Sequence, residues 1–205
     1  MHLVTTIPAA APVLTAADVR AHARTPSTDD GYLETLIAAA TSWVEAWLGR
    51  ALVNRTYTYK VDGFPGQCVW SDPPTWQHGG EILLPYPTLQ SVTSVTYRDT
   101  ETTTATLSAS TEYEVDTGSL PGRIRLRYGA SWPNTLGHPQ SVTIVYVAGF
   151  GPTGEMVPEQ IRHAIRLLVA HLYENREATS PLAINQVPYG IEALLMPWRC
   201  FTRFA

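Results

Sequence analysis

Apolar residues recur at helical spacing in one long segment, PEQIRHAIRLLVAHLYENRE, which runs from Pro158 to Glu177. The apolar positions are separated by three and four residues and form one broad stripe: Ile161, Ala164, Ile165, Leu168, Val169, Leu172 and Tyr173. Pro158 suits the first helical position, where its missing N–H leaves no hydrogen bond unmade. We therefore predict a long core helix whose apolar face other segments must cover.

A short helix is predicted near the N-terminus, over Ala16–Arg24. Thr15 is a suitable N-cap and Asp18 places an acid in the first turn, while Pro26 ends the helix. Residues 1–13 come before it and are expected to be a flexible arm, because prolines interrupt them.

A second, longer helix is predicted to begin at a cap on Thr28 or Asp29 and to end before Gly49, which is placed as a C′ residue. Its apolar positions again keep helical spacing: Leu33, Leu36, Ile37, Ala40, Trp43, Val44, Trp47 and Leu48. This helix is the expected packing partner of the long one.

Between the helices the pattern changes to alternation, rich in Thr, Tyr and Val, as is typical of half-buried strands. The segment RTYTYKV after Asn54 shows it first, and the Gly-, Pro- and Trp-rich stretch Asp62–Gly80 is expected to be a long loop. Further strands are predicted over 81–84, 89–98, 103–107, 112–116, 123–127 and 141–148.

Two of these strands can be paired from the sequence. If residues 117–122 close a hairpin, one face is ionic and the other apolar. The ionic pairs are Asp116 with Arg123, Glu114 with Arg125 and Glu112 with Arg127, and on the apolar face Tyr113 and Val115 oppose Leu126 and Ile124. A solvated surface ladder is one interpretation of these charges, and a contact between subunits is the other.

The C-terminal segment is predicted to form a short helix carrying Ile191, Leu194 and Leu195, which Pro197 ends. The tail that follows is aromatic and basic, and such a patch is unfavourable in water, so it either folds back on the chain or docks on a partner. The residues that we assign to a partner interface are Trp198, Arg199, Phe201, Arg203 and Phe204.

The order of elements predicts an α+β fold, described most simply as a four-helix bundle with an inserted antiparallel β region. The helices occupy 15–49 and 158–198, the β insertion 50–150 and the tail 198–205, so that 14–205 form a single domain. A parallel α/β sheet is disfavoured because helices do not alternate with the strands.

The composition of the chain argues against several classes of function. The formal net charge is −4 and the pI near 5.8, which argues against nucleic-acid or anionic-membrane binding by bulk charge. The two cysteines, Cys68 and Cys200, give neither a disulfide framework nor a thiolate zinc site. No apolar run reaches membrane-spanning length and the N-terminus lacks a signal-peptide pattern, so we expect a soluble, unprocessed intracellular protein.

The most prominent motif is a GxGxxG at Gly149–Gly154, after a strand and before the long helix. In a dinucleotide site the helix begins within the glycines, so that its free N–H groups meet the pyrophosphate. Here the helix begins four residues later, at Pro158, and the expected acid is not at a strand end. A turn is the better interpretation.

Other chemistry is weakly indicated. His163 and His171 share the long helix, but at eight residues apart they are more than two turns distant. There is no HExxH and no GxSxG, so the sequence predicts no enzyme, no metal and no cofactor. Trp70 and Trp76, in the Gly/Pro-rich loop, suggest a carbohydrate-binding β module as the alternative function.

The chain as a whole resembles one family, the head-tail connector (head-completion adaptor) proteins of long-tailed double-stranded DNA phages and prophages. The matching segments are LTAADVRAHAR (14–24), DDGYLETLIAAATSWVEAWLGRAL (29–52), LPYPTLQSVTSVTY (84–97), PGRIRL (121–126), VTIVYVAGFG (142–151), VPEQIRHAIRLLVAHLYENRE (157–177) and PYGIEALLMPWR (188–199). They span nearly all of the chain after residue 13. The Trp-rich loop from Cys68 to Gly80 is atypical.

The resemblance implies a structural virion protein of the neck, assembled in the host cytoplasm, with no catalytic residues. It implies a ring of about twelve copies beneath the portal protein. That ring extends the channel through which double-stranded DNA passes without specific binding, and it offers a docking site to a neck, stopper or tail-completion protein. Neither a membrane nor a cofactor is implied.

Overall fold

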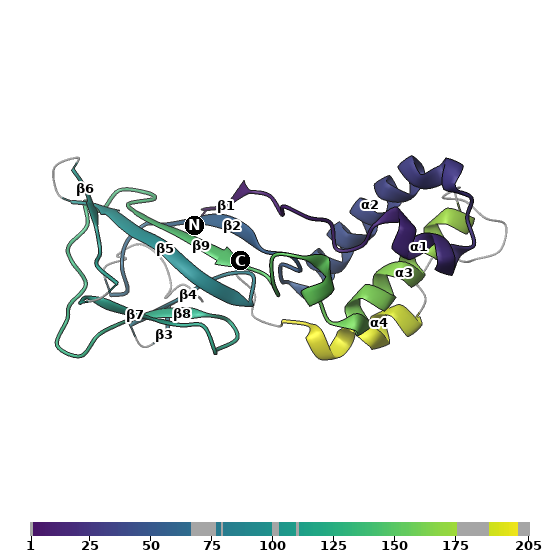
Figure 1. Ribbon diagram of the computed structural model, residues 1–205. Helices are drawn as coiled ribbons and strands as arrows, with labels where there is room; N and C mark the ends of the chain where they lie inside the picture. Colours follow the sequence, from purple (N-terminus) through teal and green to yellow (C-terminus); the bar gives the residue numbers. More distant parts are fainter. Residues whose placement is uncertain are drawn as a thin grey trace.

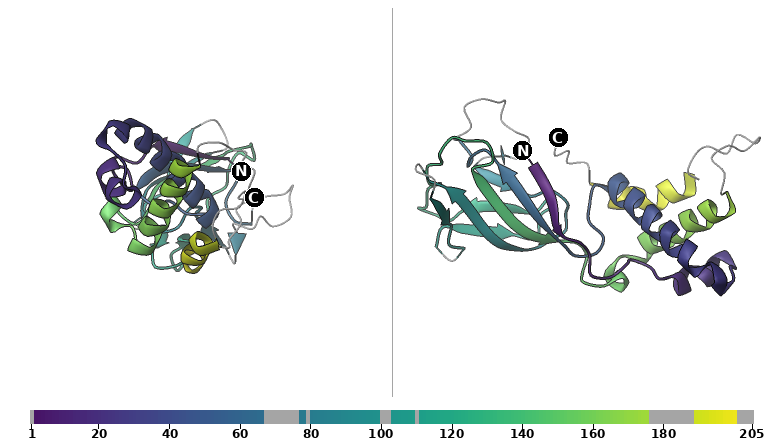
Figure 2. Two further views of the ribbon diagram at one scale, coloured as in Figure 1. Left: turned by 90° about the vertical axis from the view of Figure 1, so that its right-hand side faces the viewer. Right: turned by 90° about the horizontal axis from the view of Figure 1, so that it is seen from above.

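The computed structural model describes residues 2–66, 77–78, 80–99, 103–109, 111–175 and 189–200. The molecule is elongated, with strands gathered at one end and helices at the other (Figures 1 and 2). Each end has its own hydrophobic core. We call them the strand lobe and the helical lobe.

The helical lobe contains α1 (Ala16–Ala23), α2 (Asp30–Leu48), α3 (Glu159–Glu174) and α4 (Tyr189–Leu195), with short 3₁₀ turns η1 (Ser27–Asp29), η2 (Gly154–Met156) and η3 (Met196–Trp198). These helices were all predicted from the sequence. Thr15 and Asp18 form a reciprocal capping box at the start of α1, and Gly49 ends α2 with a positive φ of 67°. Pro158 precedes the first turn of α3 rather than lying within it.

The core of the helical lobe forms where α3 packs against the other three helices. The apolar stripe that the sequence predicts on α3 is buried at Ile161, Ala164, Ile165, Leu168 and Val169. Facing it are Leu33, Ile37, Val44 and Leu48 of α2, together with Val19 of α1 and Ile191 and Leu195 of α4. Full burial stabilises each large aliphatic side chain by about 1.5–3 kcal/mol, so this stripe holds the lobe together.

The strand lobe consists of two antiparallel sheets. The larger has the order β1 (His2–Ile7), β2 (Arg55–Val61), β9 (Val142–Ala148), β5 (Leu89–Arg98), β6 (Thr104–Thr106). The smaller has the order β3 (Gln77–His78), β4 (Glu81–Leu83), β8 (Arg123–Leu126), β7 (Tyr113–Asp116). Except for β1 and β3, these strands match the alternating segments of the sequence.

The two sheets bury alternate residues of their strands in one shared core. In β2 and β9 the buried residues are Tyr57, Tyr59, Val61, Val142, Ile144, Tyr146 and Ala148, as period-2 alternation requires. The smaller sheet contributes Ile82, Tyr113 and Ile124 to the same core. The Tyr146 hydroxyl donates to the Pro85 carbonyl at 2.8 Å, which satisfies its buried polar atom.

The α+β class is therefore confirmed, but the description of the fold as mostly a helical bundle is not, because the structure is richer in sheet. The strands are not an addition to a helical bundle. They form a lobe whose hydrophobic core is separate from the core of the helices. The physical reason is that the apolar faces of the two sheets pack against each other. They therefore do not cover the helices.

The N-terminal residues also differ from the expected flexible arm. His2–Ile7 form β1, which pairs antiparallel with β2 from His2 opposite Lys60 to Ile7 opposite Thr56. The segment is rich in β-branched residues and contains no Asp, Glu, Lys or Arg, so it can extend the open edge of β2. Its side chains remain mostly exposed, Ile7 by 58%, and the sequence therefore shows no alternation there.

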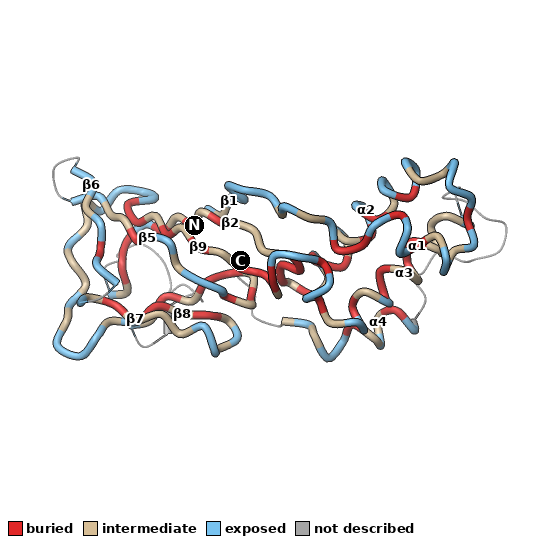
Figure 3. The backbone as a smooth tube through the Cα atoms, in the orientation of Figure 1, coloured by how far each residue is buried: buried red, intermediate tan, exposed pale blue. Residues whose placement is uncertain are grey.

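Three backbone segments join the lobes: the linker 8–14, residues 49–55 and residues 149–158. We call this region the waist, and Figure 3 shows buried positions continuing through it. Two of the segments are paired by backbone hydrogen bonds, Phe150 N–H to Leu52 O and Asn54 N–H to Gly151 O, both 2.9 Å. The waist is thus a short stretch of ordered backbone between the two cores.

A buried carboxylate reinforces the waist. The Glu45 side chain at the end of α2 accepts the Leu52 N–H at 3.1 Å and pairs with Arg55 of β2 at 2.9 Å. Burial raises the pKa of this carboxyl, and the two partners oppose that rise. The pair ties the last turn of a helix in one lobe to the first residue of a strand in the other.

The glycines of the GxGxxG motif lie in this waist, and close approach explains them. Gly149 has a φ of 146°, and a Cβ there would lie 2.5 Å from the Asn54 nitrogen and 2.6 Å from the Val53 carbonyl carbon. A Cβ on Gly154 would overlap the Val13 carbonyl oxygen of the linker. Since α3 begins only at Glu159, the motif is a structural crossing and not a phosphate cradle.

We expect Gly149→Ala to destabilise the fold by about 3 kcal/mol or more, because both the backbone conformation and the contact with residues 53–54 exclude a Cβ. Thermal or urea unfolding measures this loss of stability. The matched control is Gly31→Ala, at an exposed position of α2 where an added Cβ has nothing within 4 Å. This substitution should stabilise the fold by about 0.5–1 kcal/mol. Equal melting of wild type and Gly149→Ala would contradict this view of the waist.

Candidate assembly surfaces

The hairpin of β7 and β8 has the register that the sequence predicts. Asp116 lies opposite Arg123, Glu114 opposite Arg125, Val115 opposite Ile124 and Tyr113 opposite Leu126. Tyr113 and Ile124 are buried in the core between the sheets, which leaves the charged residues on the outer face. We call this outer face the charged ladder; it comprises Glu81, Glu112, Glu114, Asp116, Arg123, Arg125 and Arg127.

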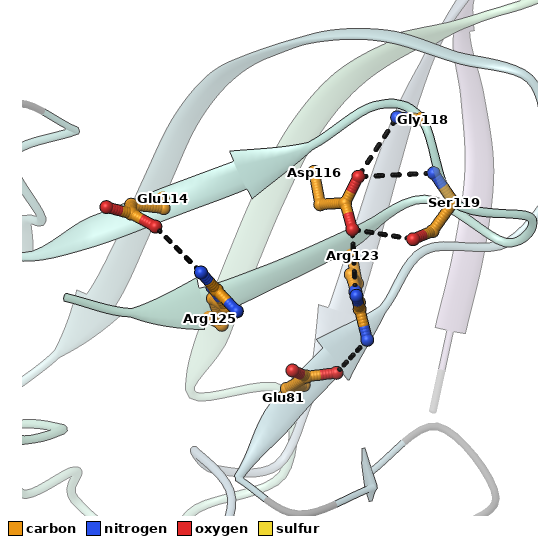
Figure 4. A network of polar contacts seen from close by, with 7 residues as sticks. All are labelled: Glu81, Glu114, Asp116, Gly118, Ser119, Arg123 and Arg125. Atoms are coloured by element: carbon orange, nitrogen blue, oxygen red, sulfur yellow. Dashed lines mark hydrogen bonds and ion pairs between the residues drawn. The ribbon is translucent and has the colours of Figure 1, made fainter. Parts of the chain in front are cut away.

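Asp116 and Arg123 are the centre of the ladder (Figure 4). The Arg123 Nε donates to Asp116 at 2.8 Å, and its Nη1 donates to Glu81 of β4 at 2.9 Å. Asp116 also accepts the Ser119 hydroxyl at 2.6 Å and the backbone N–H groups of Gly118 and Ser119 at 3.0 and 3.2 Å. One carboxylate therefore closes the turn and aligns the arginine that bridges three strands.

These hydrogen bonds favour the charged forms of both partners. The Ser119 hydroxyl, followed by the Arg123 guanidinium, lowers the pKa of Asp116 to about 2. Asp116, followed by Glu81, raises the pKa of Arg123. This corner of the ladder remains ionised through the physiological range.

The outer part of the ladder is looser. Arg125 pairs with Glu114 at 3.3 Å in an exposed position, and Arg127 reaches the same Glu114 at 4.0 Å. The predicted pairing of Glu112 with Arg127 is wrong at the side chains: Glu112 instead accepts the Ser108 N–H at 2.6 Å. A local turn contact is available to Glu112 at less entropic cost than a partner across the strands. Such exposed pairs contribute little to stability, which leaves their charges available to a neighbour.

A second surface is formed at the waist by the first residues of the C-terminal tail, 198–200. The Trp198 indole N–H donates to Gln160 at 2.8 Å and its ring meets Phe150 edge-on with centroids 6.0 Å apart. The Arg199 guanidinium lies over the Trp47 ring, 4.8 Å from its centroid. The Cys200 N–H donates to the Leu48 carbonyl at 2.8 Å. As far as Cys200, then, the chain folds back on its own core.

The residues assigned to a partner interface are only partly within the described chain, and that assignment stays a prediction. Trp198 and Arg199 contact the chain itself, although Arg199 remains exposed. Phe201, Arg203 and Phe204 lie outside the described residues, as do Trp70 and Trp76 of the carbohydrate-binding alternative. Their functions stay predictions.

A groove lies between the linker and α2. It has a volume of roughly 650 Å³ and is lined by residues 8–15 with Glu34, Ile37, Ala38, Thr41, Ser42, Glu45, Val53 and Arg55. Its walls are mostly small apolar side chains, with the Glu45–Arg55 pair at one end. Sequence reasoning missed it, because the linker had been expected to be flexible.

No metal-binding cluster occurs among the described residues. In particular, these residues contain no group of three or more His, Cys, Asp and Glu side chains placed to hold an ion. His163 of α3 meets His22 of α1 ring to edge at 5.8 Å, as part of helix packing. Within the same described part, none of the helices has the length and apolarity needed to cross a membrane.

The molecule thus offers surfaces for contact, and comparison with known proteins identifies the class as a structural component of the virion. A model of the head completion protein family matches residues 12–200. Because that match spans nearly the whole sequence, the chain belongs to the head completion protein family. The resemblance to head-completion adaptors is therefore confirmed. No curated protein matches this chain.

Solved structures share the fold across its full length. A chain from the neck of an empty gene transfer agent (GTA) particle, computed with C6 symmetry, is 23% identical with a TM-score of 0.73. A chain from the virion of a native GTA particle is 23% identical with a TM-score of 0.74, and one from a native neck computed with C12 symmetry is 24% identical with a TM-score of 0.72. Each comparison covers 97% of this chain and 95% of the other.

We expect the Asp116 corner to stabilise the fold in a pH-dependent way. Its folded pKa of about 2 lies below the ordinary value for aspartate, about 3.9, so the contribution is complete above pH ~4 and is lost as the pH falls through about 2. Asp116→Asn should therefore melt below wild type at neutral pH and approach it near pH 2.

Melting temperatures from pH 7 to pH 2 measure this difference. Glu114→Gln is the matched control on the same strand: it breaks only exposed ion pairs and should shift melting little at any pH. A gap between wild type and Asp116→Asn that persists unchanged to pH 2 would show that packing, not ionisation, explains it.

Proposed function

We propose that this chain is a head-tail connector that forms a ring of about twelve copies beneath the portal and extends the DNA channel. The family match over residues 12–200 carries the proposal. It is supported by the shared fold with chains of GTA necks computed with C6 and C12 symmetry. The chain would act in the virion neck after assembly in the host cytoplasm.

The mechanism is assembly. A ring requires two different surfaces on each subunit that fit one another, because each copy contacts its neighbours head to tail. The charged ladder provides one candidate, since Glu114, Arg125 and Arg127 are exposed and loosely paired. The exposed sides of α2 and α3 provide the other. Ionic contacts of this type set orientation and partner choice more than affinity.

Double-stranded DNA passes through the ring in this proposal without specific binding. A protein that grips DNA places several Lys and Arg side chains against phosphates and releases their counterions. The chain carries 14 Lys and Arg against 18 Asp and Glu, and the ladder arginines all face carboxylates. We therefore expect a channel wall without an arginine cluster.

The tail is proposed to contact the portal or the next neck, stopper or tail-completion protein. The family match ends at residue 200, where the chain has just packed against Leu48, so residues 201–205 continue from a fixed point of the waist. Two aromatic residues and an arginine in so short a segment have the composition of an interface anchor.

Mass in solution tests the ring. We expect light scattering or native mass spectrometry to give a discrete species of about twelve subunits, alone or with the portal protein encoded beside it. The control is the portal protein by itself, whose mass must change when this chain is added. A chain that stays monomeric at every concentration and ignores the portal contradicts the proposal.

Removal of residues 201–205 should leave melting unchanged and abolish joining to the portal or to the next neck protein. The truncation retains Trp198 and Cys200, whose contacts belong to the fold. A chain with the same five residues in scrambled order is the control for length and charge. Normal joining by the truncated chain would remove this function from the tail.

A further inference from the structure

A hollow on the outer face of the larger sheet gathers two cations and several hydroxyl groups. It lies near the end of the strand lobe that is far from the waist, where β6 is found (Figure 1). Its volume is roughly 270 Å³, which leaves room for an anion together with waters of ~30 Å³ each. We call it the polar hollow, and its lining includes Lys60, Thr96, Arg98, Thr104, Ser141 and Thr143.

The register of the sheet brings these side chains together. Lys60 of β2 lies opposite Thr143 of β9, and Thr143 lies opposite Thr96 of β5. Arg98 follows two residues after Thr96 and lies opposite Thr104 of β6, so it shares the same side of the sheet. The residues on either side of Lys60 in β2 are buried, which places this row on the outer face.

The two cations of the polar hollow have no acidic partner. Lys60, the only lysine of the sequence, and Arg98 form no ion pair with any residue that the structure describes. No Asp or Glu belongs to the described lining. Asp62, two residues after Lys60, instead accepts the Gln140 N–H at 2.9 Å.

The other arginines in the described part of the chain are mostly in a different position. Seven of them form ion pairs with carboxylates. Arg50 and Arg199 lie over aromatic rings, and only Arg24, at the end of α1, resembles Arg98 in having neither kind of partner. Two unpaired positive charges in one hollow are therefore unusual for this acidic chain. Because like charges repel, an anion bound between them would be favourable.

The remaining groups of the polar hollow indicate which anion it fits. The Thr104 and Thr143 hydroxyls line it and can donate hydrogen bonds, as Lys60 and Arg98 can. Lysine, arginine and threonine are the side chains that contact phosphate oxygens in proteins. An extended DNA backbone would require a longer row of cations, so two of them match a single phosphate group.

We propose that the polar hollow binds one phosphate group between Lys60 and Arg98, with the threonine hydroxyls as further donors. This site goes beyond the proposed function, because it lies within one chain and does not require the ring. Two sources can supply a phosphate group of this kind, the free phosphate ion and the backbone of DNA. Binding experiments distinguish them.

Titration with inorganic phosphate tests the site. The melting temperature of the wild-type chain should rise with phosphate concentration when sodium chloride holds the ionic strength constant, because the ligand binds the folded state. The width of the ³¹P NMR line of phosphate measures the binding itself. Lys60→Met and Arg98→Met should each weaken binding by about tenfold or more, since each removes a charged donor.

Two further variants separate the site from a general effect of charge. Arg24→Met removes the same charge from an exposed position of the helical lobe and should bind phosphate like wild type. Thr143→Val retains the β-branched shape and the net charge, and should weaken binding through loss of the hydroxyl. Wild-type binding by Lys60→Met, or an equal loss in Arg24→Met, overturns the site.

A short DNA duplex distinguishes the two sources. If Lys60→Met weakens binding of both the duplex and inorganic phosphate, the DNA backbone supplies the group; if it weakens only phosphate binding, the free ion does. A wild-type chain without saturable phosphate binding overturns the site, whatever its behaviour with DNA. These measurements use the single chain, so their failure is distinct from failure of the ring, which mass in solution tests.

Discussion

The close crossing of two backbone segments at the waist is the constraint on which the rest of the structure depends. Residues 52–54 and 149–151 approach until their N–H and carbonyl groups pair, and only glycine fits at residue 149. The crossing fixes where β9 ends and where α3 can begin. It also sets the direction in which each lobe leaves the waist, with the Glu45–Arg55 pair as a second tie. Each lobe buries its own core, and the waist is where the two lobes are joined.

Most of the local structure could be predicted from the sequence, because the spacing of apolar residues and the capping of helices are local properties. The stripe on α3, the capping box at Thr15 and the Gly49 cap all follow from such signals. The hairpin register followed because opposite charges and apolar residues alternate in step on both strands. These patterns need no knowledge of the rest of the chain.

What could not be predicted depends on contacts between distant segments. The edge strand β1 buries almost nothing, so it leaves no alternation in the sequence, and its partner strand β2 lies far along the chain, with Ile7 opposite Thr56 and His2 opposite Lys60. The two separate cores were missed because apolar patterns do not say which faces meet. Glu112 had an equally plausible partner in the turn that precedes it, the Ser108 N–H. The burial of Arg50 could not be predicted either, since charged side chains usually lie at the surface.

The surfaces have different physical characters that suit an assembling protein. The charged ladder lies on the outer face of the hairpin, and at its Asp116 corner the charges are paired within the subunit. The waist holds aromatic rings against arginines, with Arg50 over Phe150 and Arg199 over Trp47.

Electron cryo-microscopy of particles from the phage or prophage that encodes this chain tests the central claim most directly. The account predicts density for this fold as a closed ring directly beneath the portal, with DNA or an open channel along its axis. Density for the chain elsewhere in the particle, or particles complete without it, would contradict the account.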